Sequence, residues 1–240
     1  MRRSMVVIFS ALCCATMTGR PASAFELIET LWYAGDIDTG GGFINYIPSS
    51  GTQFEMFESF EVTDPDGWRV RQVWSNGFSQ FVPTVTFAEW SIREGMGPGN
   101  GGSIVMDGVG GVTPTATGRF HQIPMAQDYP EYEFRVLGLD FVLPPGTYWL
   151  NVTPLGGELL ISPTSGANGV GTPIGANGGA LWWWSDLFHN YDAVAEGFSM
   201  GVAGAPLPEP GASLASIVAL AALAVCGARS RVLMRSASGR

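Results

Sequence analysis

Apolar and polar residues alternate with a period of two along several stretches in the middle of the chain. In the clearest stretch, Tyr132, Phe134 and Val136 alternate with charged residues. The same pattern surrounds four further apolar sets: Phe54, Met56, Phe60 and Val62; Trp68 and Val70; Ala88, Trp90 and Ile92; Phe198, Met200 and Val202. A strand of this kind has one face on a core and the other in water. The alternation therefore predicts antiparallel β-sheets.

The alternation changes phase at Leu137-Gly138, after which Leu139, Phe141 and Leu143 form the apolar set. A glycine at such a change predicts a β-bulge, or a strand that bends from one sheet to the other. The sequence Pro-Pro-Gly at 144–146 then predicts a tight turn into the next strand.

Glycine-rich stretches divide the predicted strands. Residues 40–42, 95–102 and 108–111 are expected to be loops, and Ser162 to Gly179 a longer loop. Many short strands with frequent turn signals favour an all-β fold, a single antiparallel β-sandwich of jelly-roll type. Residues 25–205 are long enough for one domain with a sizeable core.

Cysteine and charge restrict the function of residues 25–205. All three cysteines, Cys13, Cys14 and Cys226, lie outside this range, which excludes disulfides and thiolate chemistry from it. The range contains five arginines and 20 acidic residues, a formal charge of −15, and the whole chain has no lysine. Such a surface repels phosphate backbones, so nucleic-acid binding is not expected.

The N-terminal end has the features of a secretory signal peptide. Arg2 and Arg3 precede a short apolar stretch from Met5 to Met17, and Ala22-Ser23-Ala24 forms a small-residue cleavage site. We therefore expect residues 1–24 to be a signal peptide and the rest of the chain to be exported.

The C-terminal end contains a second apolar segment. Residues 211–228 carry no charge and no proline, a length near the lower limit for a transmembrane helix. The residues Arg229, Arg231, Arg235 and Arg240 follow it, and no acidic residue does. This asymmetry predicts that the C-terminus lies in the cytoplasm.

Pro208-Glu209-Pro210, the apolar segment and the arginine-rich end together resemble the PEP-CTERM sorting signal of Gram-negative bacteria. The resemblance implies that residues 206–240 are a sorting segment, recognised and cleaved by an exosortase near Pro208, Glu209 and Pro210. It implies no catalytic residue in this chain. The middle of the chain also resembles exported domains that precede such signals, through Trp68-Arg69-Val70 and the stretch 143–150.

Three consecutive tryptophans, Trp182, Trp183 and Trp184, precede Asp186 and Tyr191. Consecutive strand residues point to opposite faces, so the three indoles cannot all enter one core. Aromatic faces stack on sugar rings, and these residues could bind polysaccharide. Alternatively, two indoles pack inward and the third covers a sheet edge.

Two short acidic segments are candidate calcium sites. One contains Asp36 and Asp38, and the other, Asp-Pro-Asp-Gly, contains Asp64 and Asp66. The second segment is also a favourable turn sequence. No other cofactor is expected.

The histidines, His121 and His189, have no catalytic motif around them. A Ser-His-Asp arrangement could still form in space. The sequence therefore predicts a non-enzymatic protein of the cell surface or extracellular matrix, with a structural or adhesive role in a polysaccharide layer. The alternatives are a carbohydrate-binding module and, less favoured, a hydrolase of surface polymers. The expected partners are an exosortase, the membrane and polysaccharide.

Overall fold

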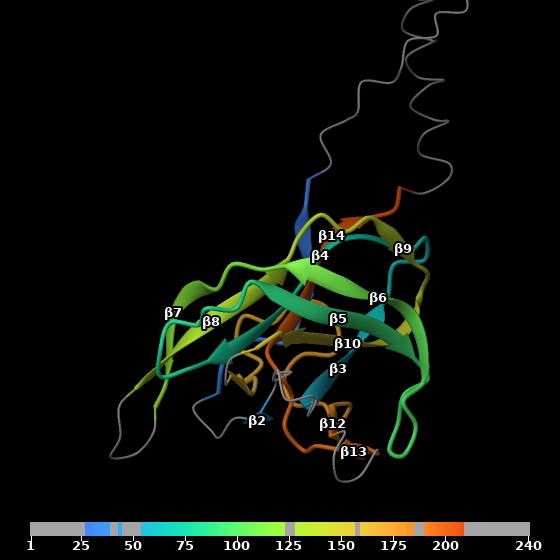
Figure 1. Cartoon of the computed structure of the whole chain (residues 1–240). Helices are drawn as coiled ribbons and strands as arrows, with labels where there is room; N and C mark the ends of the chain where they lie inside the picture. Colours follow the sequence, from blue (N-terminus) through green and yellow to red (C-terminus); the bar gives the residue numbers. More distant parts are fainter. Residues whose placement is uncertain are drawn as a thin grey trace, which may run out of the picture.

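A computed structural model describes residues 27–38, 43–44, 54–122, 128–156, 159–184 and 190–208. In these residues the regular secondary structure is entirely β-strand (Figure 1). The strands are β1 (Glu29–Tyr33), β2 (Phe43–Ile44), β3 (Phe54–Val62), β4 (Trp68–Phe78), β5 (Phe87–Glu94), β6 (Ser103–Gly111), β7 (Thr115–His121), β8 (Tyr129–Val136), β9 (Phe141–Leu143), β10 (Gly146–Pro154), β11 (Leu160–Ile161), β12 (Leu181–Trp184), β13 (Tyr191–Ala193) and β14 (Met200–Pro206).

The strands form two antiparallel sheets. The first sheet has the order β1-β14-β4-β11-β2, with β8 and β9 paired to β4, and β7 paired to β8. The second has the order β13-β12-β3-β10-β5-β6. Without the short strands β2, β9, β11, β12 and β13 and the edge strand β7, the orders are β1-β14-β4-β8 and β3-β10-β5-β6. The prediction of an all-β protein with antiparallel sheets is confirmed.

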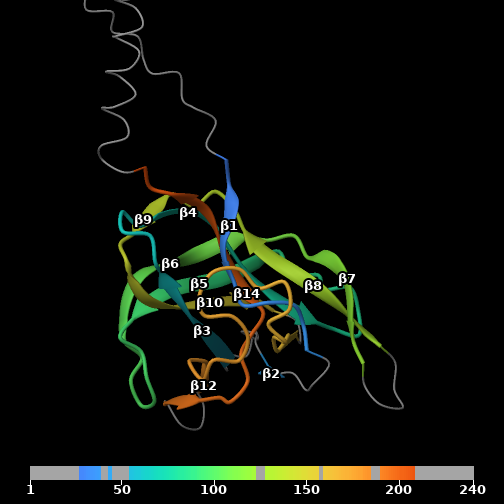
Figure 2. The same cartoon turned by 180° about the vertical axis from the view of Figure 1, so that it is seen from behind.

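β1 and β14 are neighbours, with Glu29 opposite Gly204, so the first and last strands lie side by side. β1 begins and β14 ends at the same end of the molecule, whereas β12 lies at the opposite end (Figures 1 and 2). The predicted signal peptide, the apolar segment 211–228 and the tail arginines lie outside the described residues. Within the described ranges, no helix is long and apolar enough to span a membrane.

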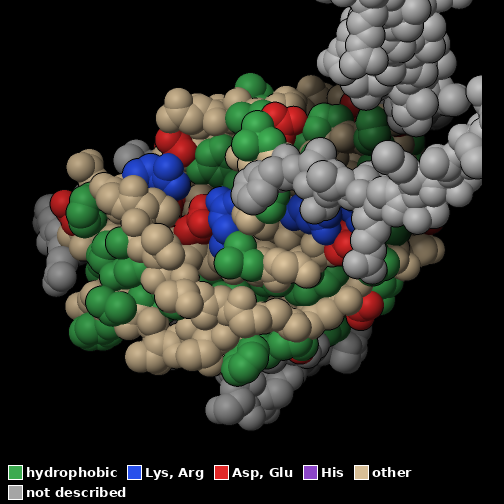
Figure 3. Space-filling model, turned by 90° about the horizontal axis from the view of Figure 1, so that it is seen from above, with side chains coloured by type: hydrophobic (Ala, Val, Ile, Leu, Met, Phe, Trp, Pro, Cys, Tyr) green, Lys and Arg blue, Asp and Glu red, His purple; other side chains and the backbone are tan. Residues whose placement is uncertain are grey.

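Arginines of the first sheet are paired with acidic residues. The pairs are Arg69 and Arg71 with Asp140, Arg119 with Asp36 and Glu131, and Arg135 with Glu133. Figure 3 shows arginine side chains beside acidic ones across the face seen from above. These four arginines belong to strands β4, β7 and β8, and the fifth arginine of the domain, Arg93, lies on the second sheet.

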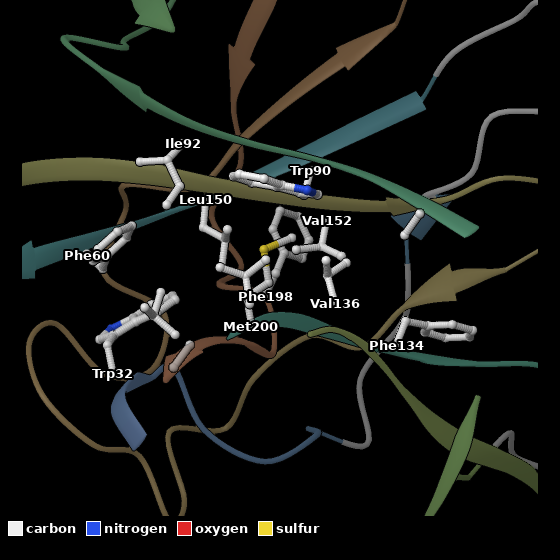
Figure 4. Close-up of a cluster of buried hydrophobic side chains, with 14 of the residues drawn as sticks. Trp32, Phe60, Trp90, Ile92, Phe134, Val136, Leu150, Val152, Phe198 and Met200 are labelled. Carbon is white, nitrogen blue, oxygen red and sulfur yellow. The ribbon is translucent and has the colours of Figure 1, made fainter. Parts of the chain in front are cut away.

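The core lies between the two sheets (Figure 4). Its largest fully buried side chains include Trp32, Phe60, Leu150, Phe198 and Met200. The rings of Trp32 and Phe60 stack at 5.2 Å. Burial of one such side chain contributes roughly 1.5–3 kcal/mol. The alternation predicted the inward positions of Phe60, Phe198 and Met200, because every second residue of a strand faces the same side.

The phase change at Gly138 occurs within one sheet. Gly138 has a left-handed φ of 76°, and Leu137 before it is exposed. β8 and β9, on either side of it, both pair with β4. The chain therefore does not pass from one sheet to the other at Gly138. Of the two predicted alternatives, only an irregularity within one sheet remains. The chain crosses to the second sheet only at the predicted turn 144–146, which leads into β10.

One predicted loop is wrong and two are confirmed. Residues 108–111 form the end of β6 and pair with β5. Glycine is used there because a Cβ on Gly110 would overlap Val136 of the opposite sheet. Residues 95–102 connect β5 and β6, and no named strand lies between Ser162 and Gly179. Residues 40–42 fall outside the described ranges.

Candidate functional site

The outer face of the second sheet, which points away from the core, carries polar and aromatic side chains. Several of the polar ones are nevertheless buried. Asn151 on β10 is 2% exposed and Thr153 is 0% exposed, although both alternate with core residues. Ser91 on β5 is also buried. The amide of Asn151 donates to the carbonyl of Met56 and the hydroxyl of Thr153. This face is therefore organised by its own hydrogen bonds.

A hollow of about 240 Å³ opens among these residues on strands β3, β10, β5 and β6. We call it the acidic hollow. Its lining residues are Glu55, Glu89, Trp90, Ser91, Arg93, Ile104, Asp107, Gly108, Val109 and Asn151. In the sheet, Ser91 lies opposite Asn151 on one side and opposite Asp107 on the other.

Arg93 joins the acidic hollow to a group of aromatic rings. Its Nη1 donates to the carbonyl of Gly101 and to the hydroxyl of Tyr191. Its guanidinium carbon lies 5.3 Å from the ring centre of Phe57 and 5.8 Å from that of Tyr191. The Nε atom is buried and has no hydrogen-bond partner. A buried guanidinium N–H without an acceptor is costly to the fold.

Glu55 is the most perturbed carboxyl group of the acidic hollow. Burial raises its pKa to about 7. The positive charge of Arg93 lowers this pKa, and the negative charge of Glu89 raises it further. Glu55 therefore exchanges its proton near neutral pH. Nearby carboxylates and a desolvated acid of this kind are typical of binding and catalytic sites.

The aromatic group lies beside the acidic hollow. Buried Phe57, Met96 and Leu181 form its base, and Trp149, Trp183 and Tyr191 pack against them, partly exposed. We call these six residues the outer aromatic cluster. The rings of Trp183 and Tyr191 are 6.4 Å apart, and the indole of Trp149 donates to the carbonyl of Gly179. A Cβ on Gly101 would overlap the ring of Tyr191, so the β5–β6 loop lies directly on that ring.

The predicted aromatic site is divided between the two faces of β12. Trp183 and Tyr191 lie in the outer aromatic cluster, whereas Trp182 packs against the main core. Trp184 belongs to β12, but its side chain and Asp186 lie outside the described residues. The sequence reasoning did not single out Arg93, Glu55 or Trp149. The sequence signal that could have identified them is their position in the alternating pattern, which places all three on the side of the strand that faces away from the core.

The candidate calcium residues lie in two places. Asp36 accepts hydrogen bonds from Arg119, from the hydroxyl of Tyr33 and from Asn168, so both of its oxygens are engaged. Asp64 caps its own turn by accepting from the backbone N–H of Asp66. Among the residues that the structure describes, no three His, Cys, Asp or Glu side chains are grouped as a metal site. Calcium binding at Asp36, Asp38, Asp64 or Asp66 stays a prediction.

His121 is buried and stacks on Phe78 at 4.3 Å between ring centres. Burial lowers its pKa, and its Nδ1 has no hydrogen-bond partner. This nitrogen therefore has neither the carboxylate nor the hydroxyl that a catalytic triad requires. His189 lies outside the described residues.

Pro208 is the last described residue, and the other predicted sorting residues, Glu209, Pro210, Arg229, Arg231 and Arg235, follow it. Comparisons with protein-family models, with curated proteins and with solved structures found no match. The function is therefore inferred from the geometry of the outer face of the second sheet.

Proposed function

We propose that this chain is an exported surface protein whose β-sandwich binds polysaccharide on the outer face of its second sheet. The strand orders β1-β14-β4-β8 and β3-β10-β5-β6 support a jelly roll, an architecture that includes lectin domains. The role is structural or adhesive rather than catalytic.

The observation that carries the proposal is the acidic hollow next to the outer aromatic cluster. Ligand sites combine aromatic surface with a few fixed polar groups. Here Trp149 and Trp183 supply partly exposed ring surface, and Ser91 and Arg93 supply a hydroxyl and a guanidinium group. A sugar presents both an apolar ring face and hydroxyls. These two surfaces match the two parts of the site.

A glycan array of the full chain, purified in detergent, tests this proposal. We expect binding to a restricted set of polysaccharides, and loss of that binding in Trp183→Ala. Arg71→Lys on the first sheet is the control and should bind as the unchanged protein does. Binding to no glycan, or equal binding by Trp183→Ala, would overturn the proposal.

The proposed route to the surface uses both ends of the chain. Residues 1–24 would direct export, and residues 206–240 would anchor the chain in the membrane until an exosortase cleaves near Pro208. The neighbouring positions of β1 and β14 bring the two ends of the domain together. Intact mass of the protein from cells with and without the exosortase tests this route. We expect a mass that corresponds to residues from Phe25 to about Pro208, and only in cells that contain the exosortase. A mass that still includes Arg240 would contradict this route.

A further inference from the structure

β6 is an open edge strand of the second sheet. It pairs with β5 from Ser103 to Gly111, and it is the last strand in the order β13-β12-β3-β10-β5-β6 (Figure 1). In an antiparallel pair, alternate residues direct their N–H and C=O groups away from the partner strand. Among the described residues, no other segment forms a backbone hydrogen bond with residues 103–111. This side of β6 can therefore pair with another strand.

The other edge strands of the described sheets are covered, short or irregular. The edge of β1 is covered by a loop, because Tyr33 and Val170 exchange two backbone hydrogen bonds. β13 has three residues and accepts a hydrogen bond from the β5–β6 loop. β2 has only two residues, and β7 carries a bulge. Natural proteins protect sheet edges in these ways.

β6 is less protected than these edges. Its register with β5 shifts once near its beginning, which leaves residues 106–111 as a regular edge. The strand contains one charged residue, Asp107, and no proline, and Val109 is 60% exposed. Three of its last four residues are glycine, so a second backbone can approach closely there.

A second copy of the same strand matches this edge. In an antiparallel pair with a two-fold axis at Val109, the two valines lie side by side. Asp107 of each copy then lies opposite Gly111 of the other, which separates the two carboxyl groups by roughly 13 Å along the strands. This separation exceeds the screening length of about 8 Å in physiological salt. Because domains with a charge of −15 repel each other, a contact with so few carboxyl groups is favoured.

We propose that two copies of this chain pair through β6 and join their second sheets into one continuous sheet. The axis at Val109 is perpendicular to the sheet, so both outer faces point to the same side. Two regular segments of this length form about six hydrogen bonds, near the lower limit for a protein interface. The dimer is therefore reversible and forms at micromolar concentrations. This pairing does not depend on what the outer faces bind.

Sedimentation velocity of the full chain in detergent, over a series of protein concentrations, tests the inference. We expect a monomer at low concentration and a dimer at high concentration. Val109→Lys should stay monomeric, because two ammonium groups would meet at the axis. Val142→Lys, at an exposed valine on β9 of the first sheet, is the control and should dimerise as the unchanged protein does. A monomer at every soluble concentration, or equal association of the two variants, would overturn the inference.

Two cysteine variants locate the axis without relying on a loss of association. They are made in a chain whose three native cysteines are replaced by serine. A short bismaleimide should join two copies of Val109→Cys. It should not join two copies of Ile104→Cys, because these positions lie roughly 30 Å apart along the paired strands. The reverse result, or no crosslink in either variant, would also overturn the inference. Glycan binding by a monomeric chain would leave the proposed function intact.

Discussion

Nη1 of Arg93 donates to the hydroxyl of Tyr191 at 3.1 Å, while the guanidinium also lies near the rings of Tyr191 and Phe57. One side chain thus positions the acidic hollow and the outer aromatic cluster relative to each other. Lysine cannot reproduce this geometry because its ammonium is a point charge without a planar fork.

We therefore predict that Arg93→Lys weakens binding of the glycan selected on the array by at least tenfold. The hydrogen bonds to Gly101 and Tyr191 would be lost together, and both position the β5–β6 loop. Titration of the glycan against the variant checks this, with Arg71→Lys as the control. Wild-type affinity in Arg93→Lys would contradict the role of the guanidinium.

Trp182 and Trp183 offer a comparison between adjacent residues of one type. Trp182 packs on the main core, so Trp182→Ala should destabilise the fold by about 3 kcal/mol. Trp183 packs on the outer aromatic cluster, so Trp183→Ala should cost about 1 kcal/mol and abolish glycan binding. Urea unfolding followed by tryptophan fluorescence measures both. The reverse order of stabilities would show that the faces of β12 are wrongly assigned.

Buried carboxyl groups make stability depend on pH. Burial raises the pKa of Glu58 to about 8 and that of Glu55 to about 7, whereas both titrate near 4.5 when exposed. Above pH 4.5 the unfolded chain therefore binds fewer protons at these sites than the folded chain does. The stability that they contribute is fully present below pH 4.5. It decreases as the pH rises above that value, and it is lost once the pH has risen through 7 to 8.

We expect the melting temperature to fall by roughly 5 °C between pH 5 and pH 8.5. Glu58→Gln should flatten this dependence, because the amide does not ionise and can still accept from the N–H of Phe198. Calorimetry at five pH values checks both statements. A melting temperature that rises over this range in the unchanged protein would disprove the assignment.

Arg119 stabilises a carboxylate on the first sheet that is completely buried. Its Nε donates to Glu131 at 2.6 Å, and Glu131 is 0% exposed. We predict that Arg119→Met destabilises the protein by about 3 kcal/mol, because an uncompensated buried charge remains. Arg69→Met, at the exposed pair with Asp140, is the control and should leave the unfolding midpoint unchanged. Equal midpoints for the two variants would contradict the prediction.

Two neighbouring glycines test the close approach of the sheets at the end of β6. A Cβ on Gly110 would overlap Val136, whereas one on Gly111 has only a carbonyl oxygen at 4.0 Å. Gly110→Ala should therefore destabilise the fold by about 2 kcal/mol, and Gly111→Ala by less than about 0.5 kcal/mol. Thermal unfolding of both variants provides the measurement. If Gly110→Ala is as stable as Gly111→Ala, residues 108–111 are not packed as the end of β6.

The sequence predicted the strands better than it predicted the site. Alternation identifies the inward side of a strand directly, which is why Phe60, Trp90 and Met200 were correctly placed in the core. It also places Glu58 on the inward side, yet a lone carboxyl group gives no local sign that it will be buried against Asn177 and Phe198. That partnership depends on loops distant in sequence.

The acidic hollow could not be predicted for a related reason. Glu55, Glu89 and Asp107 are far apart in the chain, and only the pairing order β3-β10-β5-β6 brings them to one face. In the same way, glycines at 108–111 indicate a loop locally, and only the opposite sheet explains them as part of a strand. Trp183 was singled out by composition, but its separation from Trp182 required the register of β12.

The position of β14 affects how the domain would respond to a mechanical load. This last strand lies between β1 and β4 and is hydrogen-bonded to both. Hydrogen bonds between antiparallel strands run perpendicular to the strands. If the C-terminus is tethered while a polymer holds the second sheet, tension along β14 loads both ladders in shear. All of these bonds then resist together instead of opening one at a time, so a surface protein attached in this way would withstand drag.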